Sequence, residues 1–381
     1  MPETVTCDIA IAGGGLAGGL IALALAERQP RLDVRLIEPE PQIGGNHIWS
    51  FFDSDVSPDH RWLVDPLICH RWPAYDVAFP AHRRTLETGY NSIESERLDA
   101  LVRARLKPEQ IIATKAAEVT RDRIVLDGQR IIEARLIIDA RGPADLSCLT
   151  PGWQKFLGQR LRIEGGHALI RPMVMDATVP QHGGYLFVYC LPFDADTVFV
   201  EDTYYSGGPD LAPDQLRQRI AAYAKGRGWR IEAVEREETG ILPVATGGDF
   251  TAYWASGGPA AKAGLRAGLF HPLTGYSLPD AVRLAVRIAA DPAMTPQTAE
   301  AYATERWAEQ SYYRMLGRML FEAAEPEQRY RVFERFYRLS PALIGRFYAG
   351  QSTLFDKIRI LSGRPPVPIG RAMRAIMGQR A

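Results

Sequence analysis

A glycine-rich turn near the N-terminus constrains the fold of this chain more than any other feature. The sequence GGGLAG fits the pattern GxGxxG, with Gly13, Gly15 and Gly18 at its three fixed positions. An apolar run, Cys7 to Ala12, precedes the turn, and an Ala- and Leu-rich stretch follows it to about Glu27. This order predicts a buried strand, a tight turn and a helix, which together begin a dinucleotide-binding α/β unit.

An acidic residue stands where such a unit needs one. A second apolar run, Val34 to Ile37, ends in Glu38, which lies 20 residues past Gly18. The glycines allow close approach of a pyrophosphate, the helix N-terminus favours its negative charge, and Glu38 would accept a hydrogen bond from a ribose hydroxyl. The sequence therefore predicts nucleotide binding. The alternative is a glycine-rich turn in an α/β unit that binds no cofactor.

Length and composition exclude several classes of protein. A chain of 381 residues is long enough for two or three domains. Its 45 basic and 45 acidic residues balance, so the whole chain has no electrostatic signature of a nucleic-acid-binding protein. The four cysteines are far apart and form no CxxC pair, so neither a zinc site nor a small disulfide framework is indicated. We expect a cytoplasmic protein without a signal peptide or membrane span.

The C-terminal segment is basic. From Arg306 to Ala381 there are fourteen Lys or Arg and six Asp or Glu residues. A helical face of arginines opposes a face of aromatic residues there; the two faces contain Arg331, Arg335, Arg338 and Phe333, Phe336, Tyr337. Such a helix lies on an anionic membrane surface, or it packs its aromatic face on the core with the arginines in solvent.

Two carboxylates interrupt an apolar strand in the sequence FVEDTYY. The turn-forming residues Phe193 to Asp196 separate two aromatic and aliphatic runs, which predicts a β-hairpin. Side chains alternate along a strand, so Glu201 and Asp202 are expected on opposite faces unless a bulge brings both inward. Desolvation in such surroundings raises the pKa of a carboxyl group, as a general acid requires. The alternative is a carboxylate that pairs with an arginine or with backbone N–H groups.

Later segments favour FAD over NAD. The stretches LIIDARG, at Leu136 to Gly142, and SIESERLDALVRAR, at Ser92 to Arg105, resemble the returning strand and preceding helix of the glutathione-reductase type of FAD-binding protein. Asp139, Arg141 and Gly142 are therefore candidate cofactor-binding residues. Asp139 and Arg141 are alternatively structural partners of each other.

Four further stretches identify a family. GGNHIWSFFDSD, FVEDTYY, FHPLTGYSLPDA and FYAGQSTLFDKIRILSGRPPVPIG occur in order over nearly the whole chain and closely resemble the bacterial lycopene β-cyclases. A Gly-Asp pair common in flavin monooxygenases is missing from the segment Gly257 to Ala285.

The loop inside FHPLTGYSLPDA supplies the last predicted cofactor contacts. Pro272 and Gly275 are expected to shape a turn, and a helix is expected to start near Ser277 with its positive end toward the flavin. His271 and Thr274 are further candidates. His271 is alternatively a hydrogen-bonded core residue.

The resemblance implies a chemistry. In this family, both acyclic ends of lycopene are protonated and closed to β-rings, giving β-carotene via γ-carotene without net redox change, although reduced FAD is needed and NADPH supplies electrons. Glu201 matches the acidic residue of the family's carboxylate motif, and Asp202 is the second catalytic candidate. Implied partners are lycopene, other carotenoids with an acyclic end, and the surface of the inner membrane. The rival functions are a flavin-dependent monooxygenase or reductase acting on a prenyl or carotenoid substrate, and a flavin-loaded lipid carrier.

The expected architecture is α/β. A Rossmann-like FAD-binding domain would comprise residues 1–150 and 255–300, with a substrate-layer insertion near 60–90. A β-rich substrate domain would follow at 151–254 and a helical, basic C-terminal region at 301–381.

Overall fold

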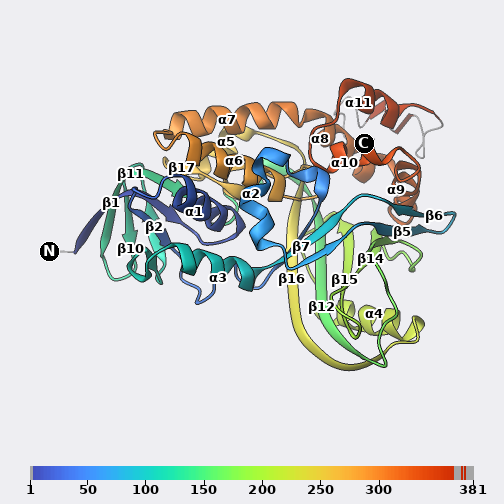
Figure 1. The fold of residues 1–381 in the computed structure, drawn as a ribbon. Coiled ribbons are helices and arrows are strands. Elements are labelled where there is room, and N and C mark those ends of the chain that lie inside the picture. The colour runs from blue at the N-terminus through green and yellow to red at the C-terminus, as the bar shows by residue number, and fades with distance from the viewer. Residues whose placement is uncertain (1–2, 364–369, 372, 375–381) are drawn as a thin grey trace.

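A parallel sheet carries the predicted nucleotide-binding unit. The computed structural model describes residues 3–363, 370–371 and 373–374 (Figure 1). At the centre of this sheet, β1 (Thr4–Ala12) runs parallel to β2 (Val34–Ile37) and to β11 (Ile131–Asp139). The remaining strands are β8 (Ile111–Ile112) and β17 (Ala261–Lys262), both parallel, and the antiparallel β9 (Ala116–Val119) and β10 (Arg123–Leu126). The predicted strand, turn, helix and second strand are confirmed.

The alternation of β1 explains how this sheet is covered. Ile9 and Ile11 belong to a core cluster with α1 (Leu16–Arg28), α3 (Ser95–Arg105) and α6 (Leu278–Ala290). Ala10 and Ala12 face a second cluster, which includes the buried side chains of β10. The helix α3 begins at Ser95 rather than at Ser92, because residues 92–94 complete the preceding strand, β7 (Tyr90–Glu94).

A second sheet is mostly antiparallel and holds the predicted hairpin. Its order is β16-β12-β15-β14-β13-β5-β6. The pair β14 (Tyr185–Pro192) and β15 (Thr197–Ser206) is antiparallel, with Tyr189 opposite Glu201. Helix α4 (Pro213–Gly226) packs on the outer face of this sheet (Figure 1). The other strands are β5 (Tyr75–Phe79), β6 (His82–Leu86), β12 (Leu149–Glu164), β13 (Met173–Asp176) and β16 (Arg230–Gly248).

A small antiparallel sheet and short helices complete the central part of the chain. The sheet consists of β3 (Ile48–Phe52), β7 (Tyr90–Glu94) and β4 (His70–Trp72), in that order. The short helices are α2 (Arg61–Val64) and α5 (Phe250–Ser256).

The C-terminal region is helical, as predicted. It contains α7 (Pro296–Glu309), α8 (Ser311–Arg318), a π-helical turn (Met319–Ala323), α9 (Tyr330–Phe336), α10 (Pro341–Tyr348) and α11 (Leu354–Leu361). Phe333, Phe336 and Tyr337 are buried in the core cluster that also contains aromatic residues of β14 and β15. The aromatic face of α9 therefore packs on the core, as in the second of the two interpretations above. Within the described residues, no helix has the length and apolar character needed to cross a bilayer.

Candidate active site

The glycine turn leaves the start of α1 open. Gly13 has φ +101°, and its N–H donates to the carbonyl of Ile37 over 2.8 Å. A Cβ atom at Gly18 would lie 1.9 Å from the Gly13 carbonyl oxygen, whereas one at Gly15 would have no neighbour within 4 Å. Gly15 is the N-cap of α1 and offers no capping side chain, so the first N–H groups of this helix are available to an anion.

Glu38 lies beside this turn. Its Oε2 accepts from the N–H of Gly14 over 2.6 Å, and its Oε1 accepts from the N–H of Glu40 over 3.0 Å. These bonds fix the carboxylate at the end of β2, where a ribose hydroxyl is expected in a dinucleotide-binding fold.

Asp139 and Arg141 bond to each other. The Arg141 guanidinium donates to both carboxylate oxygens of Asp139 over 2.9 and 2.8 Å, and Arg266 approaches the same carboxylate at 2.7 Å. This arrangement favours the structural role that the sequence left open for the two residues. The neighbouring Gly142 lines the cavity described below.

The predicted residues of the loop before α6 fall into two groups, one in the core and one at the cavity. The ring of His271 is buried, with Nε2 3.1 Å from the Phe347 carbonyl oxygen and Nδ1 accepting from the N–H of Leu273, and burial lowers its pKa to about 4. His271 is thus a neutral, hydrogen-bonded core residue, and Pro272 is buried next to it. Thr274 and Gly275 line the cavity.

Two features of this loop are suited to a bound cofactor. The hydroxyl of Thr274 is buried and has no hydrogen-bond partner among the described residues. Ser277 is the N-cap of α6, its side chain makes no capping bond, and both Ser277 and Leu278 line the cavity. Two uncapped helix N-termini, those of α1 and α6, therefore open on the same cavity, which suits an elongated anionic cofactor such as FAD.

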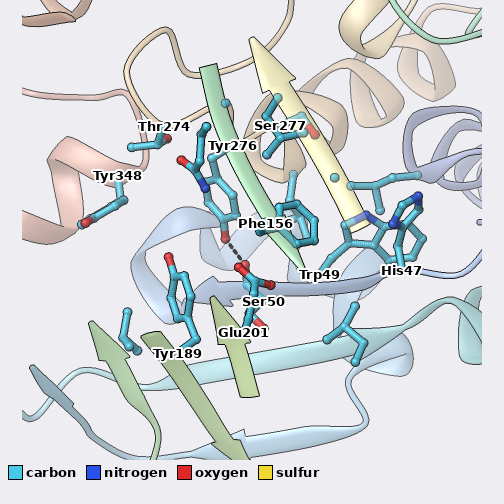
Figure 2. A pocket seen from close by; sticks show the side chains of 18 of the residues that line it. His47, Trp49, Ser50, Phe156, Tyr189, Glu201, Thr274, Tyr276, Ser277 and Tyr348 are labelled. Atoms are coloured by element: carbon cyan, nitrogen blue, oxygen red, sulfur yellow. Dashed lines mark hydrogen bonds between the residues drawn. The ribbon is translucent and has the colours of Figure 1, made fainter. Parts of the chain in front are cut away.

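One cavity of about 440 Å³ joins the glycine turn to the second sheet (Figure 2). It extends from Gly15, Ala17 and Gly142 to Glu201 on β15. In Figure 2, Glu201 and Tyr189 point into it from one side, and Tyr276 points toward them from the other. Aromatic residues dominate the wall around Glu201: Phe52, Tyr90, Phe156, Phe187, Tyr189, Phe199, Tyr205, Phe333 and Tyr348. This end is shaped for an apolar ligand.

Glu201 is the acidic group of the aromatic end. The hydroxyl of Thr203 donates to its Oε1 over 2.5 Å. Desolvation raises the pKa of Glu201 to about 8, with smaller raising contributions from Glu238 and Asp202, against the lowering effect of the Thr203 bond. Glu201 therefore holds a proton at neutral pH, as a general acid must.

Asp202 lies on the opposite face of β15, as the alternation predicted. Its two oxygens accept from the guanidinium of Arg219 on α4 over 2.6 and 2.8 Å, and only 1% of its side chain is exposed. It does not belong to the wall of the cavity. This buried ion pair favours a structural role, while a catalytic role for Asp202 stays an untested prediction.

The structure also places a hydrogen-bonded group, Tyr276 with Ser50 and Asp55, on the side of the cavity opposite Glu201, and the sequence did not predict it. The phenol oxygen of Tyr276 lies 2.5 Å from the Ser50 carbonyl oxygen and 2.9 Å from Oδ2 of Asp55. Asp55 is buried, its Oδ1 has no partner among the described residues, and burial raises its pKa to about 7. These residues fall within two of the family-like stretches, but no periodicity or spacing singles them out.

Comparison with known sequences agrees with this geometry. The family model described as lycopene cyclase protein matches residues 8–374. A lycopene beta-cyclase of Pantoea ananas is 46% identical over 375 residues, which cover 97% of this chain and 98% of that protein. A lycopene beta-cyclase of a Paracoccus species is 42% identical over 382 residues, covering 98% and 97%.

Solved structures share the fold at low identity. A geranylgeranyl bacteriochlorophyll reductase-like protein from Thermoplasma acidophilum has a TM-score of 0.62 at 13% identity, covering 99% of this chain and 100% of that one. A probable FAD-dependent monooxygenase from Pseudomonas aeruginosa has a TM-score of 0.56 at 16% identity, covering 88% and 100%. The fold is thus the FAD-binding, Rossmann-like fold of flavin-dependent enzymes. The family match over nearly the whole sequence is decisive for its membership: this chain belongs to the lycopene cyclase family.

Proposed function

We propose that this protein is a lycopene β-cyclase, an isomerase that closes both acyclic ends of lycopene to β-rings and yields β-carotene via γ-carotene. The observation that carries the proposal is Glu201, a protonated carboxyl group in an aromatic cavity that is continuous with the nucleotide-binding turn. Relatives at 42% to 46% identity named lycopene beta-cyclase support the same substrate.

In the proposed mechanism, residues of the cavity take the following roles. Glu201 donates its proton to the terminal double bond of the substrate, and the neighbouring double bond attacks the resulting carbocation to form the ring. The Glu201 carboxylate then takes a proton from the ring, which restores the acid and gives a neutral isomer, so no electrons are consumed. The aromatic faces of Tyr189 and Phe199, which line the same wall, stabilise the passing positive charge by cation-π attraction.

The cofactor in this proposal is FAD in its reduced form, with NADPH as electron donor. Gly13, Gly15 and Gly18 would admit its pyrophosphate to the α1 N-terminus, and Glu38 would accept from its ribose. Thr274, Gly275 and the α6 N-terminus would contact its ring system, with Gly142 across the cavity. Reduced FAD would supply negative charge near the aromatic end.

The substrate determines the cellular site that we propose. Lycopene is a hydrocarbon that dissolves in bilayers and not in water, so the enzyme must collect lycopene and other carotenoids with an acyclic end from a membrane. We therefore propose a cytoplasmic protein bound peripherally to the inner membrane.

An anaerobic assay tests the proposal. Purified protein is incubated with FAD, NADPH and lycopene in liposomes, and the product is followed by mass and absorbance. Cyclisation predicts a product of unchanged mass and blue-shifted absorbance, which Glu201→Gln abolishes. The matched control is Glu232→Gln, which alters an exposed carboxylate on β16 and should leave the rate unchanged. A product of changed mass would instead identify a monooxygenase or reductase.

A further inference from the structure

Helix α11 turns its apolar side outward. The exposed fractions are 74% for Leu354, 73% for Phe355, 58% for Ile358 and 44% for Leu361. Leu354, Ile358 and Leu361 recur at helical spacing and share one face, with Phe355 at its edge. A helix of a soluble protein normally shows the reverse arrangement.

The inner side of α11 is fixed by a polar anchor. Asp356 is 1% exposed, and its oxygens accept from the Arg346 guanidinium over 2.7 Å each. Thr353 and Asp356 form a reciprocal capping box at the start of the helix. These bonds determine which side of α11 faces the protein, so the outward position of its apolar residues follows from specific contacts.

A shared apolar cluster connects the helix to the aromatic end of the cavity. Ile360, on the inner side of α11, packs against the core cluster that contains Phe333 and Tyr348. Phe333 and Tyr348 line the cavity themselves. This cluster therefore connects the inner side of α11 with the wall around the proposed substrate. Figure 1 shows α11 at the outer edge of the C-terminal helices.

The charges of α11 favour an anionic surface. The only carboxylate in the helix, Asp356, is buried and paired, whereas Arg359 is exposed beside the apolar face and Lys357 is half-buried. An apolar face with cationic flanks matches a bilayer containing anionic lipids, where apolar side chains enter the acyl boundary and cations meet headgroups. A hydrophobic protein partner would not explain why α11 itself carries no exposed acidic side chain.

We infer that the outward face of α11, formed by Leu354, Phe355, Ile358 and Leu361, is the surface with which this protein docks on a membrane. This inference rests on the proposed function, because a substrate dissolved in the bilayer gives the surface its purpose. It places the contact on α11 and not on the arginine face of α9 that the sequence suggested.

Vesicle binding tests the inference. The double variant Phe355→Ser/Ile358→Ser should bind vesicles of phosphatidylglycerol and phosphatidylcholine at least about tenfold more weakly than the wild type in cosedimentation. The control Ile170→Ser removes one apolar side chain, 81% exposed, from the loop between β12 and β13 and should bind normally. Unchanged vesicle binding by the double variant overturns the inference. If light scattering also shows that the wild type is a dimer and the double variant a monomer, the outward face of α11 is instead a contact between two copies of the chain.

A second variant tests the same face without removing its apolar side chains, so that a folding defect of the double variant cannot be mistaken for loss of binding. Phe355→Trp keeps the apolar face, and its added fluorescence should be quenched by lipids brominated in the upper acyl chain, whereas that of Ile170→Trp should not. Absence of quenching at Phe355→Trp overturns the inference as well.

Lycopene supplied in detergent micelles separates the proposed docking surface from the proposed function. Cyclisation by the double variant in micelles at the wild-type rate, with a reduced rate from liposomes, supports docking through α11. A wild type that fails to cyclise in either system refutes the proposed function alone.

Discussion

Replacing Glu201 with Gln should stabilise the folded protein in alkaline solution even though it removes the proposed acid. The pKa of Glu201 is about 8 in the folded protein against an ordinary value of 4.5. Because the folded state binds this proton more tightly than the unfolded state, wild-type stability falls as pH rises from about 4.5 to about 8. Gln keeps an oxygen that can accept the Thr203 hydroxyl but does not titrate.

The size of the effect follows from the shift. A difference of about 3.5 pKa units at about 1.4 kcal/mol each sets a ceiling of about 5 kcal/mol, reached above pH 8. Because relaxation of a protein around a buried charge lowers its cost, we expect the variant to gain about 2 to 5 kcal/mol at pH 9 and almost nothing at pH 4.5.

Urea denaturation across this pH range measures the difference in free energy of unfolding. The control Glu232→Gln, which alters an exposed side chain, should change the free energy of unfolding far less. Plots of the free energy of unfolding against pH that run parallel for the wild type and Glu201→Gln would show that Glu201 is ionised in the folded protein. So would a variant that becomes less stable relative to the wild type as pH rises, and either result would refute the role of Glu201 as the acid.

Three further predictions concern the same framework. The cyclisation rate should be constant from pH 6 to 7.5 and fall about tenfold per pH unit well above pH 8, because only protonated Glu201 donates; a rate that rises through pH 9 would contradict this. Gly18→Ala should abolish flavin retention, measured by absorbance after gel filtration, because its Cβ would meet the Gly13 carbonyl oxygen at 1.9 Å, and retention at the wild-type level would argue against the assigned turn. Asp202→Asn should lower the free energy of unfolding by about 3 to 5 kcal/mol, because it removes the buried negative charge that pairs with the guanidinium of Arg219; a rate lost without any change in stability would instead indicate a catalytic Asp202.

Local patterns predicted the parts of the molecule that depend on neighbours in sequence. The strand, turn and helix from Cys7 to Glu27 follow from burial and glycine geometry, and the opposite directions of Glu201 and Asp202 follow from strand alternation. The position of Tyr276 against Asp55 did not follow, because it depends on contact between segments more than 200 residues apart. Apolar periodicity likewise could not show which of the helices α9 and α11 turns its apolar face to solvent. The orientation of α11 depends on the pair formed by its Asp356 with Arg346 of α10, a tertiary contact that periodicity does not reveal.

The continuous cavity has a consequence for biosynthesis. Its wall begins at Gly15 and ends at Tyr348, so the ribosome must translate nearly the whole message before the compartment can close. Until that moment the aromatic residues of β14 and β15 lack their cover from Phe333 and Tyr348. A growing chain that has not yet reached α10 would therefore expose this apolar surface, and we expect it to depend on chaperones until the last helices emerge from the ribosome.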